Sequence, residues 1–279
     1  MLRSDRQEIT VPSSAHTVQV IRSPRFSYRW CLELLWNLAF QRVHLRYKET
    51  FLGFGWIFLQ PVALTIIFNY IRRVADIPTG KVPYTLFVAA GLVPWSFTSL
   101  AISQSSACIF GNSSLLKRMV FPKILLPLST ILSTMADLLV MAFLLVGLFI
   151  YHRFCPSASV LWLPLIFGVH LILLVGLACL LSLTHVFLKD LGYAIPHLLW
   201  LWFFASPVFY PASMVPKEFK GLAVWNPMVG LIEGYRNTLL LGKPPSPDLF
   251  LPTIAVSVGI FLLGLAAFRV SEGVLVDML

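Results

Sequence analysis

The run FCPSASVLWLPLIFGVHLILLVGLACLLSLTHVFL at residues 154–188 decides the fold class, because it contains no Asp, Glu, Lys or Arg. A helix needs about 20 mostly apolar residues to cross the roughly 30 Å hydrocarbon layer of a membrane. Four more charge-free runs reach that length, and a further run, Ile124–His152, is interrupted by one acid, Asp137. The four are Thr50–Ile71, Val82–Leu116, Leu191–Pro216 and Leu249–Phe268. The sequence therefore predicts six transmembrane helices.

The composition excludes most other classes of protein. Of the 279 residues, 58% are apolar and 12% are charged, whereas soluble domains carry about 25% charged residues. This difference rules out an ordinary water-soluble enzyme, a disordered chain and a coiled coil. A β-barrel would show segments of roughly ten residues with alternating polarity in place of long apolar runs. We therefore expect an all-α membrane protein.

With six crossings both chain ends lie on one side of the membrane, and the basic residues predict which side. Thirteen Lys and Arg residues fall on the side of the chain ends and eight on the other side. The positive-inside rule therefore places both termini in the cytoplasm. Much of the net charge of +9 then lies along the cytoplasmic headgroups, where anionic lipid favours each basic residue by about 1 kcal/mol. We expect membrane lipid, and no nucleic acid, as the partner of this charge.

The sequence contains no motif for metal binding, disulfide formation or nucleotide binding. Its four cysteines include no CxxC pair, and its six histidines include no HExxH pattern. No stretch matches the P-loop pattern GxxxxGK[ST], so ATP-driven work needs a partner that binds the nucleotide. We predict no catalytic residue and no metal ligand in this chain.

Polar segments flank the predicted bundle. Polar side chains recur every three or four positions from Ser27 to Lys48, which predicts an amphipathic helix in the membrane interface. The apolar side of that helix holds Trp30, Leu34, Leu35 and Leu38. The predicted organisation is a flexible cytoplasmic tail without a secretory signal at 1–26, the interface helix at 27–48, a six-helix domain at 49–270 and a cytoplasmic tail at 271–279.

A short cytoplasmic helix is predicted between the second and third spans. Its residues are Asn112, Ser113, Ser114, Leu115, Leu116, Lys117 and Arg118. Asn112 or Ser113 is expected to cap its N-terminus, while Lys117 and Arg118 lie at the end where the helix dipole favours cations. Pro122 is expected to begin the next helix. A short exposed helix between two spans is suited to docking a partner.

The stretch between the fifth and sixth spans is neither a clean span nor a polar loop. Residues 205–248 carry seven prolines, and the apolar piece Met228–Leu241 has fourteen residues, too few to cross. We predict a re-entrant or interfacial helical segment on the outer side, at 211–245, because broken helices at membrane depth need protein or a water-filled passage around them. Glu233 and Arg236 share one helical face, and both a structural ion pair and a gating role fit their spacing.

Several further residues are compatible with a conduit through the membrane. Asp137 lies near the middle of the third span, where an ionised carboxylate costs about 2.5 to 3.5 kcal/mol. It fits a pathway or proton relay, or a protonated or Ser/Thr-paired acid that holds helices together. Gln60–Pro61 should bend the first span and leave polar groups that need partners. Trp56, Trp200 and Phe204 suit either the membrane interface or the wall of a passage for sugar rings.

Six motifs in order carry a family resemblance. They are RYKETFLGFGWIFLQP at 46–61, YTLFVAAGLVPWSF at 84–97, NSSLLKRMVFPKILLPLS at 112–129, KDLGYAIPHLL at 189–199, SPVFYPASMVP at 206–216 and NPMVGLIEGYRNTLL at 226–240. Together they resemble the permease subunits of bacterial polysaccharide ABC exporters, the type-two exporters of O-antigen, capsule and teichoic acid chains. The likeness covers about residues 28–270, and LVPWSF with SPVFYP brings it nearer to the O-antigen exporters than to the capsule exporters.

The resemblance implies a homodimeric permease in the bacterial inner membrane, with six helices in each protomer. Two copies of a separate ATPase would bind it, and that ATPase would hold the ATP and magnesium, so this chain would bind no cofactor and would not be an enzyme. The implied substrate is an undecaprenyl-linked polysaccharide, in the first place an O-antigen, moved from the cytoplasm to the periplasm.

The resemblance also implies roles for individual residues. The helix at 27–48 corresponds to an interface helix and the segment at 226–240 to a re-entrant periplasmic gate element. The coupling helix that docks into the ATPase corresponds to Asn112, Ser113, Leu115, Leu116, Lys117 and Arg118. The gate residues are Asn226, Pro227, Glu233 and Arg236. The residues assigned to an aromatic-lined channel between protomers are Trp56, Gln60, Trp95, Trp200, Phe204 and Tyr210.

Three alternatives stay open on the residues. A related ABC permease that exports another lipid or a drug-like substrate would show the same spans. A membrane-embedded transferase or hydrolase would use Asp137, His185 and Asp190, although none of them pairs a nucleophile with a base at a usable spacing. A channel or scaffold that works without a motor would have no P-loop ATPase encoded beside it.

Overall fold

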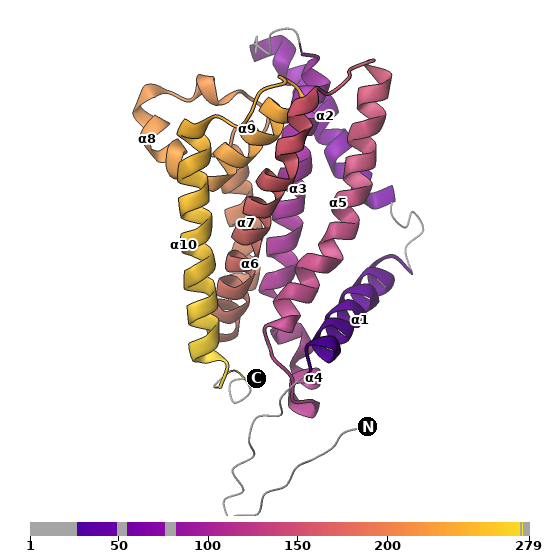
Figure 1. Ribbon diagram of the computed structural model, residues 1–279, viewed down its shortest axis with the longest axis vertical. Coiled ribbons are helices and arrows are strands. Elements are labelled where there is room, and N and C mark those ends of the chain that lie inside the picture. The colour runs from indigo at the N-terminus through magenta and orange to yellow at the C-terminus, as the bar shows by residue number, and fades with distance from the viewer. Residues whose placement is uncertain (1–26, 49–54, 76–81, 274, 276–279) are drawn as a thin grey trace, which may run out of the picture.

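The computed structural model describes residues 27–48, 55–75, 82–273 and 275, and the elements within these ranges are helical (Figure 1). The α-helices are α1 Tyr28–Tyr47, α2 Gly55–Ala75, α3 Tyr84–Ser106, α4 Ser113–Arg118, α5 Leu125–Tyr151, α6 Leu163–Phe187, α7 Leu191–Phe204, α8 Lys217–Trp225, α9 Pro227–Leu239 and α10 Pro247–Ser271. The short 3-10 helices are η1 Phe110–Asn112, η2 Ala158–Trp162 and η3 Ala212–Met214. The tail expected at 1–26 lies outside the described residues, as do residues 274 and 276–279 of the expected C-terminal tail.

Five helices of the described chain are long and apolar enough to cross a membrane. They are Gly55–Val74 in α2, Tyr84–Ser106 in α3, Leu125–Tyr151 in α5, Ala158–Phe187 across η2 and α6, and Pro247–Ser271 in α10. By length and composition they confirm five of the six predicted spans. The predicted start of the first span, at residues 50–54, lies outside the described residues.

The remaining predicted span, Leu191–Pro216, is wrong in its extent. α7 has 14 residues and ends at Phe204. Pro207 and Pro211 follow, and each disfavours a longer helix because proline lacks the N–H donor and clashes with the preceding turn. α7 accommodates Pro196 in its interior, but the chain leaves the helix before Pro207 and Pro211. At 1.5 Å per residue α7 covers about 21 Å, which is less than the thickness of the hydrocarbon layer.

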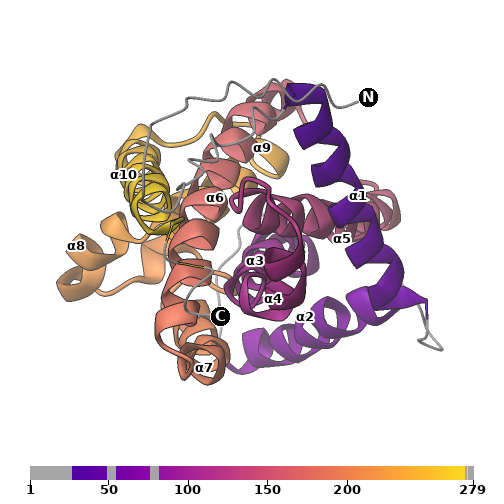
Figure 2. The ribbon, with the colours of Figure 1, turned by 90° about the horizontal axis from the view of Figure 1, so that it is seen from below.

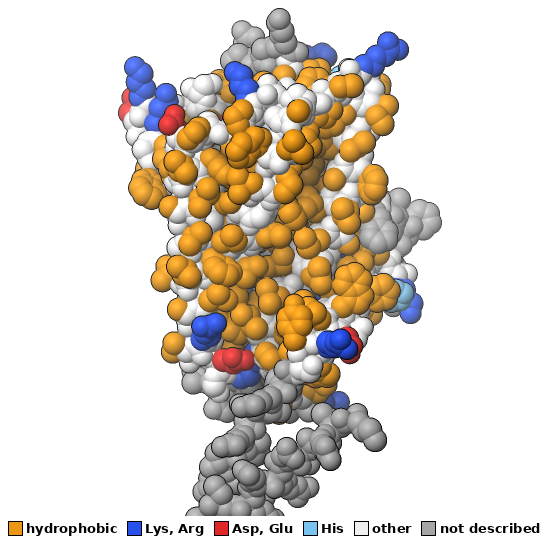
Figure 3. Space-filling view, viewed as in Figure 1, with side chains coloured by type: hydrophobic (Ala, Val, Ile, Leu, Met, Phe, Trp, Pro, Cys, Tyr) orange, Lys and Arg blue, Asp and Glu red, His pale blue; other side chains and the backbone are white. Residues whose placement is uncertain are grey.

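The long helices run beside one another along the long axis of the molecule (Figure 1). One end holds α4 and the last turn of α10, and we call it the α4 end; the opposite end holds α8 and α9, and we call it the α9 end. On the face in Figure 3, Lys, Arg, Asp and Glu side chains gather near the two ends, with a broad hydrophobic band between them. A bundle that spans a bilayer needs this distribution, because charges are costly in hydrocarbon.

The central helix is α3, which contacts α2, α5, α6, α7 and α9 (Figure 2). Within its most apolar window, 72% of the residues are buried inside the protein. Lipid provides no hydrophobic force that brings helices together, so close packing has to stabilise such a bundle. At the crossing of α6 and α10, a Cβ atom on Gly176 would lie 2.6 Å from the backbone of Phe261. Glycine therefore lets these two helices approach backbone to backbone.

The predicted helix at 27–48 is present as α1, to within one residue at each end. Its side chains Trp30, Leu34, Leu35 and Leu38 pack against the buried cluster that contains Leu116 and Phe121. Its C-terminal end reaches Asp137, halfway along α5. α1 is therefore inclined along α5 in the half of the bundle nearer the α4 end (Figure 1).

Candidate functional site

The α4 end carries the short helix that the sequence predicts as a docking element. α4 has six residues, and Leu116 anchors it by burial in a cluster with Phe121, Leu183 and Val186. Leu115 packs against the same cluster. The inner side of α4 is thereby fixed on the end of α6.

The outer side of α4 presents two cations and two apolar side chains. Lys117 and Arg118 are exposed, and Met119 and Val120 follow them with 46% and 76% of their surface exposed. Apolar side chains grouped at a projecting tip gain free energy when a partner covers them. Of the predicted coupling residues, Lys117 and Arg118 are the pair that faces outward.

Two local predictions for this segment are wrong. No side chain caps α4: the Asn112 side chain is directed backward, where its amide donates to the carbonyl oxygen of Cys108 at 2.6 Å, and Ser113 N–H donates to the carbonyl oxygen of Phe110 in η1. The next helix, α5, begins at Leu125, whose N–H donates to the carbonyl oxygen of Pro122 in a preceding turn.

The chain after α10 braces the loop that follows α4. Lys123 N–H donates to the Glu272 carboxylate at 2.9 Å, and the Lys123 ammonium donates to the Glu272 carbonyl oxygen. Leu275 is fully buried in the cluster that holds Leu116 and Phe121. Sequence reasoning did not find this contact, because it joins residues 149 positions apart.

A groove between α2, α3 and α7 brings together three of the six predicted channel residues, Gln60, Trp95 and Trp200. The groove has a volume of about 150 Å³. Its other lining residues are Leu64, Ser99, Ser103, Pro196, Leu199 and Phe203. Ser99 and Ser103 follow Trp95 at four-residue intervals on α3, and this spacing was the signal in the sequence that would have found them.

The groove combines aromatic faces with polar groups. Trp95 is 5% exposed and packs edge-on against Phe203, with ring centroids 5.4 Å apart. Trp200 is 53% exposed. The exposed Trp200 ring beside the Gln60 amide and serine hydroxyls is a surface on which sugar C–H groups can stack while sugar hydroxyls find hydrogen-bond partners.

The other three predicted channel residues lie outside the groove lining. Trp56 is one turn before Gln60 on α2 and is 52% exposed. Phe204 stacks on Trp200, with centroids 6.0 Å apart. Tyr210 donates its hydroxyl to the carbonyl oxygen of Phe204 at 3.2 Å.

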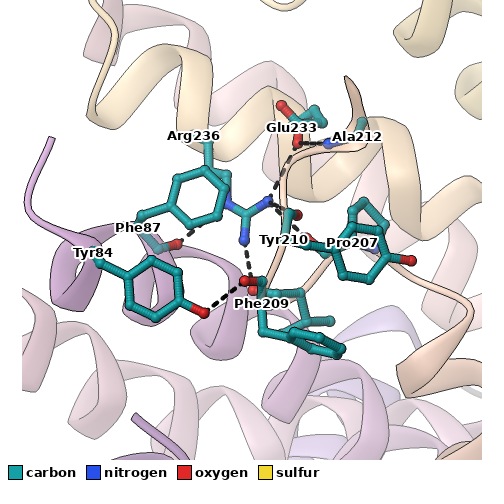
Figure 4. Close-up of polar contacts among 9 residues, drawn as sticks. Tyr84, Phe87, Pro207, Phe209, Tyr210, Ala212, Glu233 and Arg236 are labelled. Carbon is teal, nitrogen blue, oxygen red and sulfur yellow. Dashed lines mark hydrogen bonds and ion pairs between the residues drawn. The ribbon is translucent and has the colours of Figure 1, made fainter. Parts of the chain in front are cut away.

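Arg236, a predicted gate residue on α9, is 1% exposed and holds a turn of main chain in place (Figure 4). Its guanidinium donates to the carbonyl oxygens of Pro207 at 2.6 Å, Val208 at 2.5 Å, Tyr210 at 3.2 Å and Phe87 at 3.2 Å. The same group lies 3.7 Å from the centroid of the Phe87 ring. Arginine suits this place because its planar fork carries five donors.

The carbonyl groups of Pro207, Val208 and Tyr210 lie in the non-helical segment after α7, so no N–H group of a helix pairs with them and they need a donor from elsewhere. A buried carbonyl without a hydrogen bond costs about 1 to 3 kcal/mol. Gly91 of α3 leaves the space for the arrangement, since a Cβ there would lie 2.7 Å both from Nη2 of Arg236 and from the carbonyl oxygen of Val208. Arg236 and Gly91 together seat the segment after α7 against α3.

The predicted pairing of Glu233 with Arg236 is present, with nitrogen and oxygen 3.3 Å apart. Glu233 also accepts from the N–H of Ala212 at 3.1 Å, and the Tyr84 hydroxyl donates to the carbonyl oxygen of Phe209 at 2.8 Å (Figure 4). Burial lowers the pKa of Arg236 to about 10 while Glu233 opposes the shift, so the guanidinium stays charged at neutral pH. The pair is part of the internal packing of the α9 end.

Asn226, another predicted gate residue, joins α7 to α9. Its side-chain oxygen caps α9 by accepting from Met228 N–H at 3.1 Å, and Pro227 occupies the first helical position. The same oxygen accepts from the Trp202 indole at 2.9 Å, while the amide donates to the carbonyl oxygen of Ala205 at 3.2 Å. The helix expected at 226–240 therefore starts and ends within a residue of its predicted bounds.

Asp137 is buried between three helices. Its carboxylate accepts from the Arg46 guanidinium and the Tyr47 hydroxyl, both on α1, and Arg46 also donates to the Gln104 side chain on α3. The acid holds helices together, which is one of the two roles expected for it, but its partners are a cation and a phenol rather than Ser or Thr. Burial raises the pKa of Tyr47 to about 12, so its hydroxyl stays protonated as a donor.

The three residues that a membrane-embedded transferase or hydrolase would use do not contact one another in the described chain. Asp137 is engaged by Arg46, His185 stacks on Phe110 with centroids 5.9 Å apart, and Asp190 is exposed at the start of α7. Within the described ranges no group of three or more His, Cys, Asp or Glu side chains is placed to hold a metal ion.

Residues 33–240, which include α4, the groove and Arg236, match the sequence profile of the family described as ABC-2 type transporter. The chain belongs to the ABC-2 type transporter family. The family resemblance predicted from the six motifs is confirmed. α4, the groove and Arg236 all lie within the residues that match the family.

This ABC-2 type transporter is similar to curated proteins of polysaccharide export. It is 29% identical over 231 residues to the O-antigen export system permease protein RfbA of Myxococcus xanthus, covering 81% of this chain and 87% of the relative. It is 26% identical over 221 residues to the protein of that name from Klebsiella pneumoniae, covering 78% and 84%. It is 24% identical over 238 residues to the polysialic acid transport protein KpsM of Escherichia coli, covering 84% and 92%.

Proposed function

We propose that this chain is the membrane permease of an ATP-driven exporter that carries a lipid-linked polysaccharide of the O-antigen type from the cytoplasm to the periplasm across the inner membrane. The support is that the relatives named for O-antigen export match it over about four-fifths of its length, at 81% and 78%. The chain has no P-loop, so a separate ATPase supplies the hydrolysis and holds ATP and magnesium.

The observation that carries this function is the projecting tip of α4. Exposed Lys117, Arg118, Met119 and Val120 lie at one end of the bundle, while Leu116 fixes the helix to the core. A rigidly anchored helix with an uncovered, mixed basic and apolar tip is suited to transmit force from a soluble partner. We assign α4 as the coupling helix that two copies of the ATPase engage, one on each protomer.

We further propose six crossings with the α4 end in the cytoplasm. α1, α4 and the last turn of α10 share one end of the molecule (Figure 1), so the chain between them crosses an even number of times. The sixth crossing is α7 together with the residues after Phe204, which continue toward the α9 end. The excess of Lys and Arg on the side of α4 supports the orientation.

The groove is the proposed substrate path. Because it lies on the outside of one protomer, a closed passage needs a second surface, and we propose that a second copy of the chain provides it. Gln60, Trp200 and the neighbouring Trp56 would then face a shared channel for an undecaprenyl-linked glycan. Residues 211–245, held by Asn226 and Arg236, would form its periplasmic gate element.

The test uses vesicles that contain the permease and the ATPase encoded beside it. We expect ATP-dependent movement of lipid-linked O-antigen and an ATPase rate that rises when this substrate is added. Lys117→Glu with Arg118→Glu should weaken ATPase binding by about tenfold or more, since reversed charges repel at an interface. The matched control, Lys217→Glu with Lys220→Glu, reverses two exposed cations on α8 at the α9 end and should bind normally.

Normal ATPase binding and coupled export by the α4 variant, or an equal loss of ATPase binding in the α8 variant, would contradict docking at α4. Vesicles that respond to polysialic acid and not to O-antigen would assign the permease to capsule export. No response of the wild-type complex to either glycan would favour the export of another lipid.

A further inference from the structure

The Asp137 cluster lies outside the groove and is not part of the α4 tip. Asp137 is the acid near the middle of α5, and its side chain is 1% exposed. One oxygen accepts from Arg46 and the other from the Tyr47 hydroxyl, while the second terminal nitrogen of Arg46 donates to Gln104. α1 therefore supplies the donors, and α5 and α3 supply the acceptors.

The surrounding hydroxyl groups on α5 do not compete for the acid. Thr130, Ser133 and Thr134 are buried on this helix, and each donates to a carbonyl oxygen of α5 itself, at 2.7 to 2.9 Å. The hydrogen bonds to Asp137 accordingly come from α1. A carboxylate buried in a membrane bundle is stable only with such partners, so the contact ties α1 to α5 at a defined position.

The other half of α1 is attached to the anchor of α4. Trp30, Leu34, Leu35 and Leu38 pack against the cluster in which Leu116 and Phe121 are buried. α1 has 20 residues and therefore extends over about 30 Å. A single helix thus packs with one half on the cluster that buries Leu116 of α4 and reaches the Asp137 cluster with the other.

The cluster is in turn adjacent to the groove. Gln104, which accepts from Arg46, follows Ser103 directly on α3, and Ser103 lines the groove. Continuous contacts therefore run from the base of α4 along α1 to the α3 residues beside the groove.

We propose that Asp137 is a positioning residue for transport: its ion pair with Arg46 fixes the C-terminal end of α1, so that α1 carries a displacement of α4 to the groove face of α3. This role rests on the proposed function, because the ATPase is what displaces α4. It assigns Asp137 no proton transfer and no contact with the substrate.

The first measurement follows α1 directly and needs no substrate. A spin label is placed at Leu45→Cys, an exposed position beside Arg46, in a chain whose Cys31 and Cys155 are replaced by Ser. In the purified complex with the ATPase, Asp137→Asn should make the label more mobile. Arg46→Gln should have the same effect. Its matched control, Arg29→Gln, removes a positive charge from an exposed position of α1 and should leave the mobility of the label as in the parent.

The second measurement is the number of glycan chains exported for each ATP hydrolysed. Asp137→Asn and Arg46→Gln should each lower this ratio by about tenfold, a usual size for coupling between distant sites, while the binding of the ATPase stays normal. The exchange of charges, Asp137→Arg with Arg46→Asp, should restore at least half of the ratio and the immobility of the label. Gln104 can serve the exchanged pair because its amide offers both donors and an acceptor.

Two results would overturn this role for Asp137. If Asp137→Asn leaves the label immobile and the ratio of exported glycan to hydrolysed ATP normal, the ion pair is not what fixes the end of α1. A charge exchange that restores the immobile label but not export would show that the acid itself, and not its hold on α1, is required. If Asp137→Asn does not assemble, Tyr47→Phe and Arg46→Lys replace it. The expected loss of the export ratio is then about twofold to threefold, because only one hydrogen bond between membrane helices is removed or weakened. A wild-type complex that exports no glycan would contradict the proposed function, while the label would still report on α1.

Discussion

Arg236 and Arg46 reach into the interior of the bundle from opposite halves, and they are held in different ways. Arg236, at the α9 end, is 1% exposed and donates to four main-chain carbonyl groups in addition to Glu233. Arg46, nearer the α4 end, has a side chain that is 23% exposed and donates to two side chains, Asp137 and Gln104. Main-chain carbonyls cannot rotate away from their position, whereas side chains can. Arg236 thus belongs to a fixed turn of main chain, and Arg46 to a contact between side chains of separate helices, which in the role proposed above moves with α1.

Because of this difference, we expect substitution of Arg236 to cause the largest loss of stability. In Arg236→Gln the carbonyl groups of Pro207, Val208 and Tyr210 lose their donor, and we expect the free energy of unfolding to fall by about 3 to 5 kcal/mol, as when one partner of a buried ionic contact is removed. Thermal unfolding in detergent measures the loss. Lys243→Gln, at an exposed position, is the control. If Arg236→Gln unfolds within a degree or two of the parent, the turn does not depend on Arg236.

Filling the space beside Arg236 should have the second largest effect. Gly91→Ala puts a methyl group 2.7 Å from Arg236 and from Val208, and we expect a loss of about 1 to 3 kcal/mol because a packed interior has no room to relax. Gly147→Ala on α5 is the matched control, since a Cβ there meets nothing within 4 Å. Equal unfolding temperatures for the two variants would mean that the α9 end is less rigid than the contacts of Arg236 imply.

Asp137→Asn should cost less stability than either change at the α9 end, about 1 to 2 kcal/mol, because partly exposed Arg46 can turn toward Gln104 or water. Its effect on export should nevertheless exceed that of Glu233→Gln, since Arg236 keeps four carbonyl acceptors when Glu233 is neutralised. Parallel measurements of unfolding temperature and export check both statements. A larger loss of export in Glu233→Gln would reverse the assignment of fixed and mobile regions.

The smallest effects on stability are expected when either of two tyrosines is replaced by phenylalanine. Their effects on export distinguish the α9 end from the Asp137 cluster. Tyr84→Phe removes the bond to Phe209 at the α9 end, and Tyr47→Phe removes one bond to Asp137. Each should cost about 0.6 kcal/mol, the average for a hydrogen bond between membrane helices. Export should fall in Tyr47→Phe and stay unchanged in Tyr84→Phe. Equal export rates would remove the functional distinction between the two ends.

The positions of helices were largely predictable from the chain, because each depends on local composition. Apolar runs predicted five spans that the structure contains, and the short apolar piece near Glu233 predicted α9. The end of α7 was missed because hydrophobicity continues beyond Phe204, whereas the chain leaves the helix before Pro207 and Pro211. The expected cap at Asn112 was wrong because its side chain bonds backward to Cys108 in the preceding turn.

The candidate sites were predictable in their residue types and less so in their partners. Asp137 stood out as a lone acid in an apolar run, yet nothing near it in sequence indicated Arg46, which is 91 positions away. Trp95, Gln60 and Trp200 were expected to line one passage and do share a groove. Tyr210, expected beside them, has its carbonyl group bound to Arg236.

The sequence by itself determined that this is a helical membrane protein, where most of its spans lie and which short segments do not cross, because burial in lipid acts on each helix separately and is visible in its own residues. The tertiary structure alone decided that Arg46 meets Asp137, that Arg236 holds the turn after α7 and that α1 packs on the cluster that buries Leu116. Lipid is as apolar as the helix surfaces, so the pattern of apolar residues does not encode which helices are neighbours. Close packing at small residues and a few buried polar contacts make that choice.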